Sequence, residues 1–200
     1  PLQGVKEPRF PWHIVGIDTC GPYQVSHNNN KYIINLVDQF TGYPECYATP
    51  DKTAQTVAKI FLDHVFPRDF CPKYLVSDRG TEYVNSVISH INKILNIAHI
   101  QSSVYHAQSN GTVERFHRFM NDSIVKEINN DVRNWDMCIP SLLAAYRSSV
   151  HQSHKHSPHF LMHGRDPLLP LDTLLKPRRK YTRDEFHKVQ FQRLHKAYSS

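Results

Sequence analysis

Residues 12–18 read WHIVGID, a short apolar run with β-branched side chains that ends in a carboxylate. Such a run, followed by a Gly-Pro turn signal at residues 21–22, indicates a buried strand. Two similar runs follow, YIINLV at residues 32–37 and a shorter one at residues 45–49, separated by a Thr-Gly turn signal at residues 41–42. Three successive strands joined by turns predict an antiparallel meander at the start of the fold.

Helical spacing replaces the strand pattern over residues 53–66, where apolar residues recur every three or four positions. Asp51 or Thr53 can serve as the N-cap of this helix. A fourth strand is expected at residues 74–76, a helix at 84–95 and a short strand at 98–101. The order βββαβαβ predicts an α/β fold in which the first and fourth strands can pair side by side and parallel.

Three more helices are expected toward the C-terminal end. The first opens at residues 110–111 after a polar, flexible stretch, and its apolar stripe consists of Val113, Phe116, Met120 and Ile124. The second covers residues 135–146 with Asn134 as its cap, and Pro140 inside it predicts a kink. The third is short, starts at Ser157 and ends at Gly164.

Composition limits the class of protein. Two hundred residues with 40% hydrophobic content suffice for one full-sized domain, with an incoming linker at residues 1–11 and a basic extension at residues 173–200. No apolar run is long enough to span a membrane. The four cysteines form no Cys-x-x-Cys pair, so neither a zinc ribbon nor a disulfide framework is indicated, and we expect free thiols in an intracellular setting.

The net charge of +6 is concentrated at one end of the chain. Residues 176–200 hold eight Lys and Arg against two acidic residues, whereas the other residues are balanced. A neutral body with a cationic tail suits a polyanionic partner, with Arg178, Arg179 and Lys180 as candidate DNA contacts. The alternative is a solvated, charged helix or linker.

Three carboxylates stand at positions that the predicted topology can bring together. Asp18 lies in or at the end of the first strand, Asp78 follows the fourth, and Glu114 lies in the first turn of the long helix. Converging carboxylates raise one another's pKa unless cations are present, and all-oxygen ligands suit Mg²⁺ or Mn²⁺. Taken singly, each has an ordinary alternative as a turn, cap or helix-dipole residue.

The flanks of these carboxylates resemble a known family. Thirty-five residues separate Asp78 from Glu114, and their surroundings read VSDRGTEY at residues 76–83 and SNGTVER at residues 109–115. This pattern resembles the integrase core of retroviruses and, more closely, of gypsy-type LTR retrotransposons. The opening strand, the run VDQFTGY at 37–43 and the run SPHFLMHGRDP at 157–167 are similar too, so that the resemblance covers about residues 8–172.

The resemblance implies a ribonuclease H-like fold of the α/β class, with a mixed five-stranded sheet in the order βββαβαβα and helices on both faces. It implies an integrase catalytic core over residues 12–172, a polynucleotidyl transferase with associated endonuclease activity. Such an enzyme trims the 3′ ends of the element's DNA and joins them to target DNA. Asp18, Asp78 and Glu114 would hold Mg²⁺ or Mn²⁺, with two ions expected when DNA is bound.

Partners and location also follow from the resemblance. The implied partners are the element's DNA ends, target DNA and further copies of the chain in a dimer or tetramer, with no membrane. The implied place of action is the nucleus, reached from a cytoplasmic particle or preintegration complex. One departure is Ala107, which stands where relatives commonly have Pro.

Several other polar residues are further candidates for a functional role. Asn110, Glu114, Arg118 and Asn121 fall on one helical stripe, so Asn110, Arg118 and Asn121 are candidate DNA contacts, the alternative being a solvent-facing polar stripe. His106 and Gln108 belong to the stretch 105–111, expected as a flexible loop beside the site, and are further candidates. A structural zinc site among the five histidines of residues 151–163 is not expected. Asp38 is interpreted as a turn residue.

Three other functions are consistent with some of these features. A host-domesticated integrase would act as a DNA-binding or interaction module. A related nuclease would cut DNA without joining it. A pure nucleic-acid-binding module would bind no divalent ion through the carboxylates.

Overall fold

The computed structural model describes residues 7–69, 71–77, 89, 93, 95, 97–101, 107–128, 131–152, 155–174 and 183–199. These residues form two compact units, Pro1–Leu143 and Ala144–Ser200, which are described separately. Of the helix expected over residues 84–95, only residues 89, 93 and 95 are described, and all three are helical. The boundary expected at residue 172 stays a prediction.

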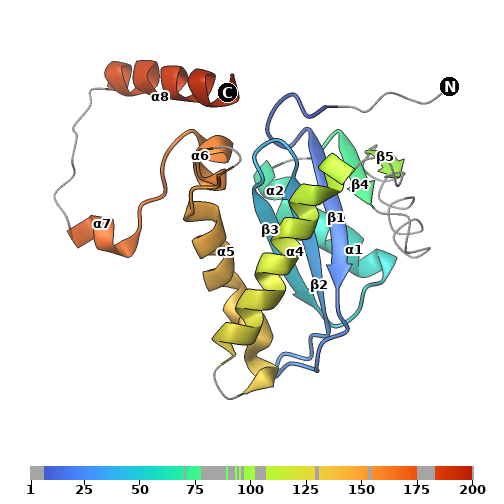
Figure 1. The fold of residues 1–200 in the computed structure, drawn as a ribbon. Helices are drawn as coiled ribbons and strands as arrows, with labels where there is room; N and C mark the ends of the chain where they lie inside the picture. Colours follow the sequence, from blue (N-terminus) through green and yellow to red (C-terminus); the bar gives the residue numbers. More distant parts are fainter. Residues whose placement is uncertain are drawn as a thin grey trace. The chain divides into compact units, whose positions relative to one another are not determined.

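A mixed sheet forms the centre of the first unit (Figure 1). Its strand order is β3-β2-β1-β4-β5, with β1 antiparallel to β2, β2 antiparallel to β3, and β4 parallel to both β1 and β5. The antiparallel meander and the parallel pairing of the first and fourth strands are therefore confirmed. The strands are β1 (Ile14–Cys20), β2 (Tyr32–Asp38), β3 (Pro44–Thr49), β4 (Tyr74–Ser77) and β5 (Ala98–Gln101).

The first strand is shifted from its predicted range of 12–18. Trp12 lies in a turn with φ 65° and donates its N–H to Asp38 Oδ1 over 2.9 Å, which takes it out of the strand ladder. The strand also continues to Cys20, because residues 18–20 pair with β2. Asp18 therefore lies inside the strand, which is one of the two positions predicted for it.

Helices cover both faces of the sheet (Figure 1). On one face lie α1 (Ala54–Ile60), the π-helical turn η1 (Phe61–Val65) and α2 (Phe66–Asp69), where the sequence predicts one regular helix. Thr53 is the N-cap, because its side chain accepts the N–H of Thr56, and Asp51 accepts in turn from Thr53.

The other face is covered by α4 (Ala107–Glu127), which buries the predicted stripe of Val113, Phe116, Met120 and Ile124. This helix begins at Ala107, so the expectation of a flexible loop through residue 111 is wrong. The apolar stripe starts only at Val113, and the polar first turn carries no sequence signal that distinguishes it from a loop.

The prediction of a single kinked helix over residues 135–146 is also wrong. The chain instead forms the 3-10 helix η2 (Val132–Cys138) and then α5 (Ile139–Ser148). Pro140 stands in the first turn of α5, where its missing N–H costs no helical hydrogen bond. Asp131, not Asn134, caps η2, because its side chain accepts the N–H of Arg133.

The second unit contains the short helices α6 (Pro158–His163) and α7 (Pro170–Leu174) and the longer α8 (Arg183–Tyr198). Ser157 caps α6 and Gly164 ends it with φ 71°, as predicted. The α8 helix contacts α6 through the Tyr198 hydroxyl, which donates to Leu161 O over 2.6 Å. Among the described residues, no helix is both long enough and apolar enough to span a membrane.

Candidate active site

Asp18 is fixed by one hydrogen-bond donor on each carboxylate oxygen. The backbone N–H of Thr19 donates to Oδ1 over 2.7 Å, and His117 Nδ1 lies 3.0 Å from Oδ2. The Asp18 side chain is 37% exposed, whereas that of His117 is 15% exposed. The carboxylate is thus oriented on its protein side and open to solvent on the other.

Glu114 stands on α4, three residues before His117, and its side chain is exposed. Together with Asp18 it lines one hollow that is partly open to solvent, which we call the carboxylate hollow. The structure therefore brings together two of the three predicted carboxylates. The residues lining the carboxylate hollow are Gly16, Ile17, Asp18, Gln39, Val76, Val113 and Glu114.

Asp78 lies outside the described residues, so its place in the site stays a prediction. The strand before Asp78 lies next to the strand that carries Asp18, because β4 runs parallel to β1 with Gly16 opposite Val76. Val76 itself lines the carboxylate hollow, and Asp78 follows it by two positions in the sequence. Among the described residues no group of three potential metal-ligating side chains occurs.

The donors of the carboxylate hollow fit a hard divalent cation. Asp18 and Glu114 contribute oxygen atoms only, which are the ligands that Mg²⁺ and Mn²⁺ prefer. Each Asp18 oxygen accepts one hydrogen bond and keeps a further lone pair. Partial ligation by such a set leaves positions for phosphate oxygens and water.

His117 is a site residue that sequence reasoning missed. Burial disfavours its charged form, but hydrogen bonds to Asp18 and Cys20 outweigh that effect and raise the pKa of His117 to about 10. Its Nε2 lies 3.0 Å from Asn35 Nδ2, and Asn35 is the cross-strand partner of Asp18 on β2. His117 lies three residues after Glu114 in the sequence, but only the packing of α4 against β1 brings its imidazole to Asp18.

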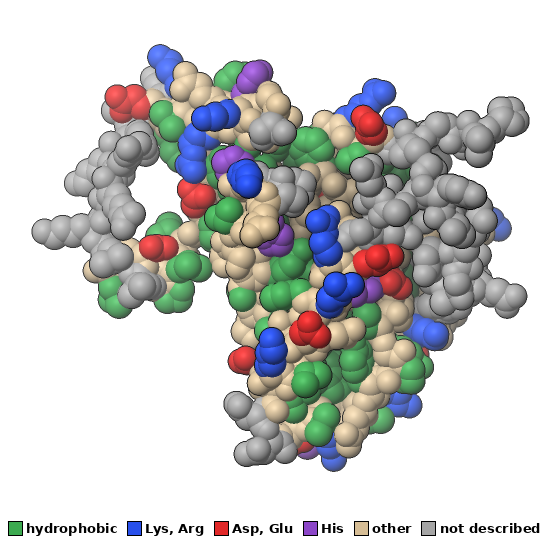
Figure 2. Space-filling view, viewed as in Figure 1, with side chains coloured by type: hydrophobic (Ala, Val, Ile, Leu, Met, Phe, Trp, Pro, Cys, Tyr) green, Lys and Arg blue, Asp and Glu red, His purple; other side chains and the backbone are tan. Residues whose placement is uncertain are grey.

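The predicted DNA contacts are only partly described. Arg118 and Asn121 are exposed on α4, and Asn121 Oδ1 accepts the Tyr23 hydroxyl over 2.7 Å. Figure 2 shows acidic, basic and histidine side chains close together over this helix. Gln108 and Asn110 belong to α4, but their side chains are not described. His106 and the basic residues Arg178, Arg179 and Lys180 lie outside the described residues.

Asp38 is a turn residue, as predicted. Its Oδ2 accepts the Thr41 N–H over 2.9 Å and the Thr41 hydroxyl over 2.6 Å, and its Oδ1 accepts the N–H of Trp12. Burial raises the pKa of Asp38 despite these hydrogen bonds. All its contacts thus hold the β2–β3 turn against the start of β1.

Comparison with known proteins gives a consistent result. Residues 10–107 match the model of the integrase core domain family. The whole chain is 31% identical over 201 residues to the retrovirus-related Pol polyprotein from transposon 412 of Drosophila melanogaster. The chain spans only 16% of the length of that polyprotein.

Solved structures with the same fold include two retroviral cores. The catalytic core domain of BIV integrase is 25% identical, with a TM-score of 0.56 over 74% of this chain and 91% of that one. The HTLV-2 integrase catalytic core domain, in complex with magnesium in a trimeric form, is 17% identical. Its TM-score is 0.58 over 77% of this chain and 98% of that one. The predicted ribonuclease H-like α/β class is confirmed by these likenesses.

Proposed function

Because this chain belongs to the family of retroviral-type integrase cores, we propose that it acts as a polynucleotidyl transferase that inserts retroelement DNA into target DNA. The observation that carries this proposal is that Asp18 of β1 and Glu114 of α4 line the same hollow. The reaction has two steps, trimming of the element's 3′ ends by water and attack of the new 3′-hydroxyls on target phosphates.

The carboxylates of Asp18, Asp78 and Glu114 would together hold Mg²⁺ or Mn²⁺, two ions when DNA is present. The magnesium complex of the HTLV-2 core supports this choice of metal. When bound, such ions activate the attacking oxygen and stabilise the leaving one in an in-line displacement at phosphorus.

The chain's own residues orient the reactants. Asp18 is held by Thr19 and His117, so its carboxylate presents a fixed edge to the hollow. Apolar walls at Ile17, Val76 and Val113 limit the water around the reacting phosphate. In each step the attacking oxygen bonds to phosphorus as the 3′ oxygen of the cut strand leaves, so that no covalent enzyme intermediate is needed.

DNA is the partner that this reaction requires. Arg118 and Asn121 are exposed on the helix that carries Glu114, which suits contact with the DNA end, together with His106, Gln108 and Asn110. The basic residues Arg178, Arg179 and Lys180 would add contacts to phosphates. Joining two ends requires at least two copies of the chain, acting in the nucleus.

The test is a strand-transfer assay with oligonucleotides matching the element's ends. The chain should yield joined, branched products with Mg²⁺ or Mn²⁺, and Asp18→Asn, Asp78→Asn and Glu114→Gln should each reduce them to background. Asp122→Asn is the matched control, because Asp122 is an exposed carboxylate of α4 that does not line the carboxylate hollow.

Two outcomes would contradict the proposal. Equal background from the chain and its Asp78→Asn variant would favour a domesticated DNA-binding module. Nicked product without any branched product would favour a nuclease that cuts without joining.

A further inference from the structure

A row of polar side chains crosses the sheet beneath α4. Asp18 of β1 pairs directly with Asn35 of β2, and Asn35 pairs directly with Cys46 of β3. Directly paired residues point to the same face of a sheet, so all three side chains lie on one face. His117 of α4 packs against this row and contacts Asp18 and Asn35.

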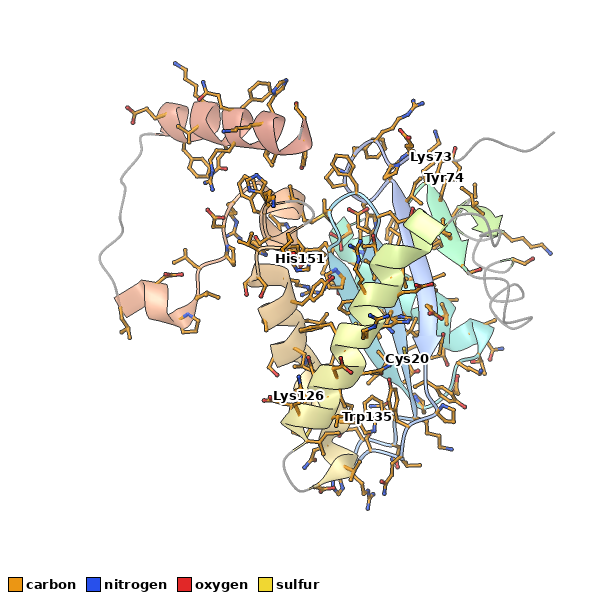
Figure 3. All side chains as sticks on the ribbon, in the orientation of Figure 1. Cys20, Lys73, Tyr74, Lys126, Trp135 and His151 are labelled. Carbon is orange, nitrogen blue, oxygen red and sulfur yellow. The ribbon has the colours of Figure 1, made fainter. Side chains whose placement is uncertain are left out.

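The buried end of the row is held by hydrogen bonds. Asn35 is 1% exposed, and its Oδ1 accepts the Cys46 thiol over 2.9 Å. Its Nδ2 donates to Cys20 Sγ over 3.4 Å and lies 3.0 Å from His117 Nε2. In Figure 3, Cys20 lies beside α4. The imidazole of His117 is therefore clamped between Asn35 on one side and Asp18 on the other.

This arrangement works in both protonation states of His117. In each state Nδ1 can carry the proton that Asp18 Oδ2 accepts. The Asn35 amide can present Nδ2 to an unprotonated Nε2 or, turned over, its oxygen to a protonated one. The contact with Asp18 can therefore form in either charge state of His117.

We propose that His117, held by Asn35, is a positioning residue that fixes the Asp18 carboxylate for divalent-metal binding, an inference that rests on the proposed function. The His117 and Thr19 donors occupy one lone pair on each Asp18 oxygen. The remaining lone pairs are then presented in one orientation, which reduces the ordering that metal binding requires. Supporting hydrogen bonds of this kind are worth 10- to 100-fold in metal affinity or activity in known metal sites.

The test is a titration of the full chain with Mn²⁺ in the absence of DNA, with free Mn²⁺ followed by electron paramagnetic resonance. His117→Leu should raise the Mn²⁺ dissociation constant about tenfold or more. His117→Asn places an amide nitrogen near the position of Nδ1 and should stay close to wild type. His117→Gln reaches past that position toward Asn35 and should behave like His117→Leu.

Two controls accompany these variants. Asp18→Asn measures whether the carboxylate binds the ion at all. His64→Leu removes an exposed imidazole of η1 that stacks on Tyr47 of β3, and it should leave the Mn²⁺ affinity unchanged. Melting temperatures are measured for every variant, and if His117→Leu fails to fold, the polar pair His117→Asn and His117→Gln decides.

Each remaining outcome has a defined meaning. If Asp18→Asn weakens Mn²⁺ binding but all three His117 variants bind like wild type, positioning by His117 is wrong and the proposed function stands. If His117→Asn is as weak as His117→Leu, the donor at Nδ1 is not the cause and the positioning role is again wrong. If Asp18→Asn binds Mn²⁺ like wild type, both the metal role of Asp18 and its positioning are wrong.

Discussion

Gly16 leaves no room for a side chain where β1 meets α4. A Cβ atom at this position would lie 2.5 Å from Val113 Cγ2, far inside van der Waals contact. Gly16 and Val113 also line the hollow that contains Asp18 and Glu114. The close approach of strand and helix therefore sets the distance between the two elements that carry these carboxylates.

Gly16→Ala should lower the free energy of unfolding by about 1–3 kcal/mol, because the added methyl group forces the helix outward. In the double variant Gly16→Ala, Val113→Ala the loss of stability should be smaller than the sum of the two single losses, since the colliding methyl group is removed. Urea denaturation of the four proteins in a double-mutant cycle measures the coupling. Additive effects would show that the two side chains do not collide.

Asp136 connects the loop after β1 to the 3-10 helix η2. Its Oδ2 accepts Ser26 Oγ over 2.7 Å, Asn28 Nδ2 over 3.1 Å and Asn30 Nδ2 over 2.7 Å. The neighbouring Trp135 reinforces the contact by donating its Nε1–H to Gln24 O over 2.7 Å (Figure 3). A buried carboxylate thus holds together two segments more than a hundred positions apart in the sequence.

Acid should weaken this connection. Burial raises the pKa of Asp136, but its three side-chain hydrogen bonds outweigh burial and lower that pKa below its usual value. The stabilisation is therefore complete above the unfolded pKa of about 3.9 and is lost as the pH falls through the folded pKa. Asp136→Ala should cost about 2–4 kcal/mol at neutral pH, because three donors lose their acceptor.

The measurement is the free energy of unfolding of wild type and variant between neutral pH and the acid limit. The difference between them should shrink only in the most acidic part of that range. A difference that already shrinks near neutral pH would contradict the lowered pKa.

Pro140 distinguishes the observed helix order from the predicted kinked helix. In the first turn of α5, Pro140→Ala should change the free energy of unfolding by less than about 1 kcal/mol, because no helical hydrogen bond is missing there. In a helix interior the same change would stabilise the protein by about 3 kcal/mol. Chemical denaturation separates the two cases, with the exposed Ser141→Ala as a control in the same turn.

Helices and strands whose apolar residues recur with a regular spacing could be predicted from the sequence. The ends of helices and a change of helix type could not. The β-branched runs before Asp18 and at β2 indicate their strands, and the stripe from Val113 to Ile124 indicates α4. The start of α4 at Ala107 and the change of helix type before Pro140 depend on hydrogen bonds that leave no periodic signal.

The site divides in the same way. Asp18 and Glu114 were found through their flanking residues and the topology that joins them. His117 was not, because its contact with Asp18 depends on how α4 packs against β1. Asn35 was not, because it lies beside Asp18 only in the observed register of β1 with β2, and a shift of one residue would turn Asn35 to the other face.

The basic residues of the chain are concentrated in its C-terminal tail. Some of them are engaged by other side chains and are less suited to bind phosphate. In the second unit Arg193 already forms an ion pair with Asp166 over 2.8 Å, and its guanidinium lies 4.6 Å from the centre of the Phe160 ring. Its charge is therefore committed to the contact between α8 and α6. The cluster Arg178, Arg179 and Lys180 carries three more positive charges in the same tail.

Replacing Arg178, Arg179 and Lys180 together by Gln should weaken DNA binding about equally for all sequences, because phosphate contacts carry no base information. Each lost phosphate contact should reduce the slope of log affinity against log salt by about 0.9, and three contacts by about 2.7. Arg193→Gln is the matched control and should leave that slope unchanged, since its guanidinium is engaged by Asp166. Fluorescence anisotropy with a labelled duplex over a range of salt concentrations gives both slopes. Equal slopes for the triple variant and wild type would assign the tail's charge to solvent rather than to DNA.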